Sequence, residues 1–368
     1  MRVLMLTTNS SLLDGINRHI LTIAPTLNEK TGIEVAVCTV FKRGKLHELL
    51  EASGVRTFSL KAPHGHSWRV LCGFYKVMRD YAPDVVHVHV FAVFEQIVSA
   101  VFFRKCKYVK TIHGLCGPLS FVDSLMQIFG VSFSTAIFVS RGVQVSYLSV
   151  RKSFLQQAVI YNPIGISART NSGSLHKRLN IRSSVPIIGT ACRIAAVKNP
   201  LAFTRIMCNV LDRIPVAHAV VMGNGVTTIL SECESIVASR KLGERFHFLG
   251  NCPEAPAMIA ELSCFVMTSS DEGMPTAVLE AMSARVPVAL WKGEGGLKDL
   301  VAMNVEAGPF AEIAEQGDED GLTAKIATLL GNESRRRELG ENALKVITSH
   351  FDVAKVSEQI RQVYLCAK

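Results

Sequence analysis

The sequence predicts two consecutive α/β domains, each built on a doubly wound parallel sheet. Short apolar runs alternate with helical stretches in both halves of the 368-residue chain, and a polar stretch separates the halves. A chain of this length also suits two hydrophobic cores better than one. In such domains a ligand is expected beyond the carboxyl ends of the strands, here in a cleft that the two domains face.

The first domain is expected over residues 1–165. Its strands are predicted from short runs rich in Val, Ile and Leu, and its helices from longer stretches with apolar residues at helical spacing. In chain order the expected elements are strand 3–6, helix 17–27, strand 34–40, helix 45–52, strand 57–60, helix 68–80, strand 84–89, helix 95–103 and strands 108–112, 136–139 and 158–161.

The second domain is expected over residues 166–350. The cluster Asn162-Pro163-Ile164-Gly165 indicates a turn, and the Ser-, Thr- and Asn-rich residues 167–180 indicate a linker. Beyond it we expect strands 186–190, 219–222, 246–249, 264–268 and 287–290, helices 201–211, 226–240, 255–262 and 275–284, and a closing helix 353–365.

Composition limits the class of protein. A hydrophobic content of 48% with 19% charged residues indicates a globular chain. No apolar run is long enough to predict a membrane span, and the first run is expected to be a buried strand rather than a leader. The ten cysteines include no C-x-x-C pair, so we expect no disulfides and a reducing cytoplasmic setting.

The net charge of +9 lies entirely in the first half. Up to Gly165 there are 18 Lys and Arg against 9 Asp and Glu, whereas the remainder has 22 of each kind. A basic half indicates an anionic partner. Two stretches that mix aromatic residues with cations suit an anionic membrane surface, although a core helix with a basic rim would give the same pattern. The candidate contacts there are Arg69, Lys76, Arg104, Lys105 and Lys107.

Residues 269–282 combine a polar loop, a helix start and two glutamates eight positions apart. Pro275 suits the first turn of a helix, whose free N–H groups suit a phosphate. Glu272 and Glu280 are acceptors suited to sugar hydroxyls. An ordinary capped helix with solvated glutamates remains the alternative. The candidate residues of this run are Glu272, Gly273, Met274, Pro275, Thr276 and Glu280.

The run E-G-M-P-T-A-V-L-E-A-M resembles the E-x7-E segment of family 4 glycosyltransferases, which are retaining enzymes of the GT-B fold. The resemblance extends along the whole chain. It implies a first domain for the acceptor, a second for a nucleotide diphosphate sugar, and a last helix, about 351–368, crossing back onto the first domain. One departure is Arg285, near a position where the family has glycine.

Further segments match the family. Gly15 would let a backbone N–H approach a diphosphate, although Asp14 replaces a first glycine. Arg193 and Lys198, five positions apart after a strand, match R-x-x-x-x-K and suit the leaving diphosphate. The resemblance implies that Glu280 grips the ribose and Glu272 the sugar. It also gives His113 a role near the donor sugar, whereas a lone histidine after a strand more often packs or caps.

Other motifs are weaker indications of function. His87 and His89 share one face of a strand, but no third Cys or carboxylate has metal-like spacing, so a structural or outer-shell role is expected rather than a metal site. Residues 318–320 match the D-x-D pattern of metal-dependent transferases but indicate a solvated helix start. Met222-Gly223-Asn224-Gly225 resembles the family's V-G-x-G, and residues 295–299 resemble its G-G-x-x-E with Asp299 in place of glutamate.

The sequence thus predicts a retaining, metal-independent hexosyltransferase that uses a nucleotide sugar. A basic domain without a span favours a lipid-linked acceptor in surface polysaccharide assembly, with the enzyme peripheral at the inner face of the cell membrane and no nucleic-acid partner. Two alternatives stay open. One is a nucleotide-sugar epimerase or hydrolase on the same fold, and the other is a non-enzymatic basic module that binds membrane or nucleic acid.

Overall fold

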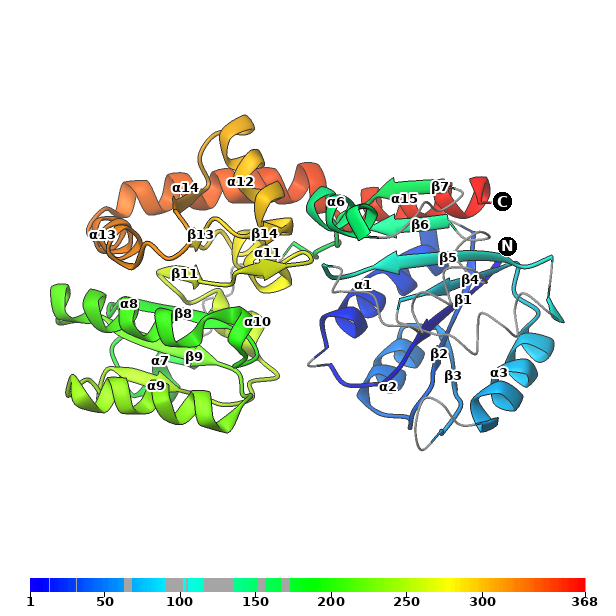
Figure 1. Ribbon diagram of the computed structural model, residues 1–368, viewed down its shortest axis with the longest axis horizontal. Coiled ribbons are helices and arrows are strands. Elements are labelled where there is room, and N and C mark those ends of the chain that lie inside the picture. The colour runs from blue at the N-terminus through cyan, green and yellow to red at the C-terminus, as the bar shows by residue number, and fades with distance from the viewer. Residues whose placement is uncertain are drawn as a thin grey trace. The chain divides into compact units, whose positions relative to one another are not determined.

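The chain folds into two compact units in the computed structural model (Figure 1). One unit comprises Met1–Pro163 with Phe351–Lys368, and the other comprises Ile164–His350. Each contains a parallel sheet with crossover helices, so the predicted fold class is confirmed. The structure describes residues 1–12, 14–30, 32–62, 68–89, 102–103, 105–115, 135–150, 156–166 and 173–367.

The first unit holds a sheet of seven strands. They are β1 (Arg2–Thr7), β2 (Glu34–Thr39), β3 (Arg56–Ser59), β4 (Val85–Val88), β5 (Lys107–Ile112), β6 (Thr135–Phe138) and β7 (Gln156–Val159). Their order is β3-β2-β1-β4-β5-β6-β7, and every pair is parallel. The described helices are α1 (Gly15–Lys30), α2 (Lys45–Ala52), α3 (Trp68–Tyr81), α6 (Arg141–Val150) and α15 (Val353–Cys366).

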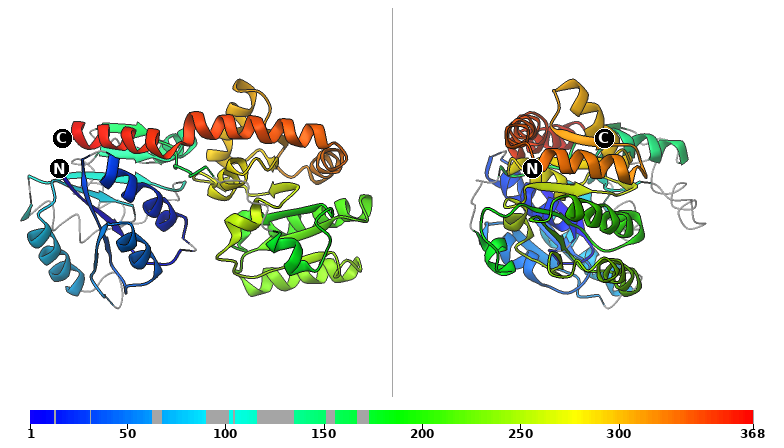
Figure 2. Two further views of the ribbon diagram at one scale, coloured as in Figure 1. Left: turned by 180° about the vertical axis from the view of Figure 1, so that it is seen from behind. Right: turned by 90° about the vertical axis from the view of Figure 1, so that its left-hand side faces the viewer.

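Alternation along the strands gives this sheet two buried faces. In β1, Val3 and Met5 pack into a core with α1, α2 and α15, whereas Leu4 and Leu6 pack with α3 on the other face. Such two-sided burial explains why the strands read as continuous apolar runs. Figure 2 shows α15, in red, beside α1, in blue.

The second unit holds a sheet of six strands. They are β8 (Ile187–Ala191), β9 (His218–Met222), β10 (Phe246–Phe248), β11 (Cys264–Met267), β13 (Val288–Trp291) and β15 (Ala311–Ala314). Their order is β10-β9-β8-β11-β13-β15, all parallel. The short strands β12 (Asp271–Glu272) and β14 (Glu294–Gly295) form a separate parallel pair.

Helices flank this second sheet. They are α7 (Ser174–Leu179), α8 (Pro200–Arg213), α9 (Thr227–Ser239), α10 (Ala255–Ile259), α11 (Thr276–Ser283), α12 (Gly296–Glu306), α13 (Glu319–Leu330) and α14 (Glu333–Val346), with a 3-10 turn η2 (Ala196–Lys198). The chain then passes through the π-helical turn η3 (Ile347–Phe351) into α15. None of the helices in the described residues is both long and apolar enough to span a bilayer.

The observed strands follow the predicted ones closely, but some elements differ. Helix 95–103 lies outside the described residues except for its last two positions. The strands β12, β14 and β15 and the helices α6, α12 and α14 have no predicted counterpart, and of α13 only the start is predicted. Asp318 caps α13 by accepting a hydrogen bond from the Gly321 N–H, which confirms the D-x-D segment as a helix start.

Arg285 leaves the backbone turn after α11 intact. It adopts a left-handed conformation, with φ of 57°, at the position that usually favours glycine. The N–H of Val286 bonds to the Ala281 carbonyl at 2.9 Å, and that of Arg285 bonds to the Met282 carbonyl at 3.1 Å. These two bonds close a Schellman motif, so the helix ends as it would with glycine.

The predicted linker over residues 167–180 is wrong at its end, because Ser174–Leu179 forms α7. A buried carboxylate, Glu261, explains this helix. Its oxygens accept the N–H groups of Leu175 and His176 at 3.0 and 3.4 Å, the Ser174 hydroxyl at 2.9 Å and the His176 ring at 3.2 Å. Glu261 therefore satisfies the free donors of the helix start from far along the chain.

Replacing Glu261 by Gln should lower the free energy of unfolding of the second unit by about 3 kcal/mol, because a fully buried carboxylate loses charge-assisted bonds. Trp291 is buried in this unit and is one of two tryptophans, so its fluorescence in a Trp68→Phe background reports the urea transition. Glu254→Gln, at an exposed ion pair with Arg178, should change stability by no more than about 0.5 kcal/mol. Equal losses of stability in the two variants would show that Glu261 has no special part in capping α7.

Candidate functional site

The candidate residues of the second unit gather where the strand order reverses. Chain order runs outward from β8 in one direction and from β11 in the other, and these two strands are neighbours. The loop after β8 carries Arg193 and Lys198, and the loop after β11 carries Glu272. The crevice at such a reversal, beyond the carboxyl ends of the strands, is where open α/β sheets bind ligands.

Lys198 and Glu272 meet across this reversal. The Lys198 Nζ lies 2.5 Å from the Glu272 Oε1, and the side chains are only 19% and 11% exposed. The Ser269 hydroxyl donates to the same oxygen at 2.7 Å. Sequence reasoning did not single out Ser269, although its position three residues before Glu272 is a usable signal. The Lys198 ammonium and the Glu272 carboxylate thus fix each other's position in the candidate site.

Backbone contacts fix the two loops to each other. The Thr268 hydroxyl donates to the Lys198 carbonyl at 3.0 Å, and the Asn199 amide donates to the Thr268 carbonyl at 2.9 Å. The Ser270 N–H bonds to the Val197 carbonyl at 3.0 Å. These bonds position Lys198 before any ligand arrives, which is the requirement for electrostatic preorganisation.

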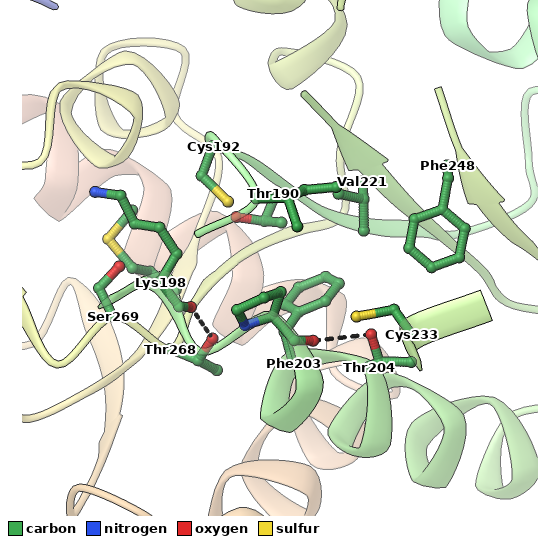
Figure 3. Close-up of a pocket in the computed structure, with 13 residues that line it drawn as sticks. Thr190, Cys192, Lys198, Phe203, Thr204, Val221, Cys233, Phe248, Thr268 and Ser269 are labelled. Atoms are coloured by element: carbon green, nitrogen blue, oxygen red, sulfur yellow. Dashed lines mark hydrogen bonds between the residues drawn. The ribbon is translucent and has the colours of Figure 1, made fainter. Parts of the chain in front are cut away.

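A pocket extends from Lys198 and Ser269 into the second unit. In Figure 3, Lys198 and Ser269 lie at one end of the pocket, and Phe248 and Cys233 lie at the other. Cys192 also lines it, and burial raises the pKa of its thiol to about 11. This cysteine is therefore protonated at neutral pH and is a poor nucleophile.

Two glycines position the loop that carries Arg193. The backbone of residues 192–194 bonds to that of 222–226 through three N–H groups. A Cβ on Gly223 would lie 1.9 Å from the Cys192 carbonyl oxygen, and one on Gly225 would lie 2.0 Å from that of Ile194. The V-G-x-G segment therefore has glycines because the loop packs directly on it. Arg193 between these contacts is exposed.

The helix starts of α11 and α12 lie beside Glu272. β12 and β14 pair Glu272 with Gly295, and a Cβ on Gly296 would approach the Gly273 carbonyl oxygen to 2.5 Å. Helix α11 begins at Thr276, one residue later than predicted, with Pro275 at its cap. Met274 and Pro275 are buried, whereas Gly273, Thr276 and Glu280 are half-buried. Two helix N-termini thus converge on one place, an arrangement that suits phosphate groups.

In the first unit, Gly15 begins α1 and is exposed. Asp14, which stands where the family has its first glycine, accepts the Ile16 N–H at 2.9 Å and the Asn9 amide at 3.2 Å. The aspartate therefore caps the helix. This local role explains the departure from the G-G pattern.

His113 belongs to a cluster of four buried or half-buried histidines. It follows β5, His87 and His89 lie on or just after β4, and His19 lies on α1. The His19 and His113 rings are 5.1 Å apart, and each lies 5.4 Å from the His89 ring. Burial lowers the pKa of His19 to about 4 and holds the pKa values of His89 and His113 well below the usual range. The imidazoles are therefore neutral at physiological pH.

His87 has the predicted structural role. Its Nδ1 lies 2.6 Å from the Tyr364 hydroxyl, and its Nε2 lies 2.7 Å from the Thr111 hydroxyl, so it joins β4, β5 and α15. The centroid of its ring lies 4.1 Å from that of the His89 ring, which confirms that both face one side. The fold also brings His19 and His113 to His89 from other segments, a convergence of which the sequence pattern gives no sign.

The basic-aromatic patch is partly described. Lys76 and Lys105 are exposed, and the exposed rings of Tyr75 and Phe102 pack edge to face at 5.5 Å. The Lys107 ammonium instead donates to the Leu365 carbonyl at 3.2 Å, near the carboxyl end of α15. Arg104 and the side chain of Arg69 lie outside the described residues.

Known proteins share this architecture. The structure of HepE from Anabaena in complex with UDP and glucose superposes with a TM-score of 0.81, at 19% identity and 99% coverage of both chains. The fold is therefore GT-B. N-acetyl-α-D-glucosaminyl L-malate synthase of Bacillus anthracis is 22% identical over 76% of this chain and 74% of its own length. The UDP-Gal:α-D-GlcNAc-diphosphoundecaprenol α-1,3-galactosyltransferase of Escherichia coli is 21% identical over 80% and 78%.

Two family matches cover most of the chain. Residues 172–346 match the glycosyl transferases group 1, and residues 13–167 match Glycosyltransferase Family 4. The chain therefore belongs to the group 1, family 4 glycosyltransferases and is a glycosyltransferase.

The close packing at Gly225 generates a stability prediction. Gly225→Ala should lower the free energy of unfolding by about 2 kcal/mol or more, because the new methyl group meets a backbone oxygen that cannot move freely. Gly243→Ala, at a turn with open space around it, should be neutral or stabilise by about 0.5 kcal/mol. Urea unfolding of both variants measures the difference. A neutral Gly225→Ala would mean that the loop carrying Arg193 is not held by this contact.

Proposed function

We propose that the enzyme transfers a hexosyl group from a nucleotide diphosphate sugar with retention of anomeric configuration. The observation that carries the proposal is the meeting of Lys198 and Glu272 across the strand reversal, with Arg193 in the same loop as Lys198. Arg193 and Lys198 would stabilise the charge that develops on the departing diphosphate, as preorganised cations do. Because these cations occupy the role of a divalent ion, we expect transfer to survive excess EDTA.

The carboxylates would hold the donor. Glu280, one to two turns inside α11, would grip the ribose, and Glu272 would hold the sugar. The Glu272 carboxylate already accepts from Lys198 and Ser269, which suits a residue that orients hydroxyls rather than one that attacks carbon. Retention would then follow from front-face attack, with the leaving phosphate accepting the proton of the acceptor hydroxyl.

The two cations are tested by single replacement. Arg193→Ala and Lys198→Ala should each lower turnover by about two orders of magnitude, because each removes a charge aimed at the leaving group. Lys241→Ala, at an exposed position of the same unit, should leave turnover unchanged. Radiolabelled nucleotide sugars with a membrane extract as acceptor give the rate, and product analysis separates transfer from hydrolysis and epimerisation. Near-normal turnover of both variants would exclude this diphosphate site.

Glu280 is tested by binding rather than turnover. Glu280→Ala should weaken the affinity for the free nucleoside diphosphate, because a ribose contact acts in the ground state as well as in the transition state. Calorimetric titration measures this affinity, with Glu234→Ala on the exposed side of α9 as the matched control. If both variants bind as the unmodified protein does, Glu280 is structural.

We further propose a lipid-linked acceptor at the inner face of the cell membrane. The excess positive charge of the first 165 residues supports this, as does the exposed aromatic pair beside Lys76 and Lys105. The relative from Escherichia coli is named for a diphosphoundecaprenol acceptor. A peripheral enzyme with a basic acceptor domain would meet such a substrate without crossing the membrane.

Membrane binding is tested with vesicles. The chain should sediment with anionic vesicles in a salt-sensitive way, since salt screens surface charge. Replacing Lys76 and Lys105 by Ser should weaken binding roughly 30-fold, at about 1 kcal/mol per cation. Lys107 stays in place because it contacts α15. Lys177→Ser with Lys241→Ser makes the same charge change on the second unit and should have no effect. Equal losses in both double variants would exclude a specific patch.

A further inference from the structure

Three histidines of the first unit bring ligand atoms together although they lie far apart in sequence. His19, His89 and His113 each offer one ring nitrogen, and the three nitrogens lie within 4.8 Å of one another. His19 comes from α1, His89 follows β4 and His113 follows β5. The convergence arises at the strand reversal between β1 and β4, where polar side chains can face inward.

The cluster leaves ring nitrogens unsatisfied. His19 and His89 are both buried. Within the described residues, the two ring nitrogens of His19 and the Nε2 of His89 have no hydrogen-bond partner. The Asn162 side chain lies close enough to His19 to raise the pKa of that ring against the larger effect of burial. The Asn162 Oδ1 nevertheless makes no hydrogen bond of normal geometry. Each such group costs about 1–3 kcal/mol when left without a partner. A bound ion that accepts one lone pair from each ring would satisfy one of the two nitrogens of His19.

The donor set indicates what that species is. Neutral imidazole nitrogens are the preferred protein ligands of zinc and similar first-row ions, and three histidines with an open fourth position form a known kind of zinc site. The His89 Nδ1 and His113 Nε2 are 3.1 Å apart. Two ligands on one tetrahedral zinc are separated by about 3.3 Å at a Zn–N distance of about 2.0–2.1 Å. The pair therefore already has the spacing of two ligands, and the proton between the two nitrogens moves to the other nitrogen of its ring when the ion binds.

We propose that His19, His89 and His113 bind one divalent transition-metal ion, with Zn²⁺ as the probe. The site contains neither Arg193 nor Lys198, and the proposed transfer assigns no step to the ion. His113 is also the residue for which the family resemblance implies a place near the donor sugar, so metal binding is measured by titration and not by transfer. The competing explanation is a water molecule that bridges the same nitrogens.

The test is a metal titration of the whole chain. Cys72 and Cys366, which are exposed, are first replaced by Ser to remove adventitious thiolate binding. The protein is stripped with a chelator, dialysed and titrated with Zn²⁺ against a fluorescent zinc indicator. We expect one ion per chain. Co²⁺ should give the visible absorption of a tetrahedral complex, and Zn²⁺ should raise the melting temperature, because an ion that binds only the folded state stabilises it.

Variants of His19 and His89 test whether the cluster binds an ion or a bridging water. His19→Ala and His89→Ala should each weaken Zn²⁺ binding about 100-fold or more, since loss of even an outer-shell partner costs about 10–100-fold. His19→Gln keeps a polar side chain of similar length, and circular dichroism checks that each variant folds. The control is the double variant of His218 and His247, a stacked pair in the second unit, which should bind as the parent does. A parent that binds no Zn²⁺, or cluster variants that bind it unchanged, would overturn the proposal.

Discussion

Both sheets depend on one topological constraint, which is that parallel strands must be joined by crossovers and that the strand order reverses once in each sheet. At the reversal the loops of two neighbouring strands turn to opposite faces and leave room between them. In the second unit this brings Lys198 from the end of β8 to Glu272 from beyond β11, residues 74 positions apart. In the first unit the same constraint brings α1 to the ends of β4 and β5. Strand order therefore brings the candidate residues of each unit together.

Much of this could be predicted from sequence, for a physical reason. Strands buried on two faces read as uninterrupted apolar runs, as β1 and β11 do, so their existence and order follow from local pattern. The helix start at Thr276 is likewise local, because proline and a small polar residue precede good helix formers. The family resemblance then supplied what local pattern cannot, namely the roles expected of Arg193 and Glu280.

What escaped prediction depends on contacts between distant segments. Helix α7 is polar and short, and its stability depends on Glu261, more than 80 positions away. The strand β15 contains a glutamate and lies at the sheet edge, so its apolar signal is weak. His19, His89 and His113 come from three separate segments, and their spacing in the sequence gives no sign that the fold brings their rings together. Asp14 shows the reverse case, since a missing family glycine is replaced by a capping aspartate.

The position of α15 has a consequence for biosynthesis. Val356, Ile360 and Tyr364 belong to the same core as Val3 and Ile23, although the whole second unit separates them along the chain. A nascent chain emerging from the ribosome therefore exposes an uncovered apolar face on its first unit until the second has been synthesised. The His87 imidazole, which bonds to Tyr364, stays without that partner for the same interval. Completion of the first unit is thus coupled in time to synthesis of the last helix, and chains that stop early present that face to chaperones and proteases.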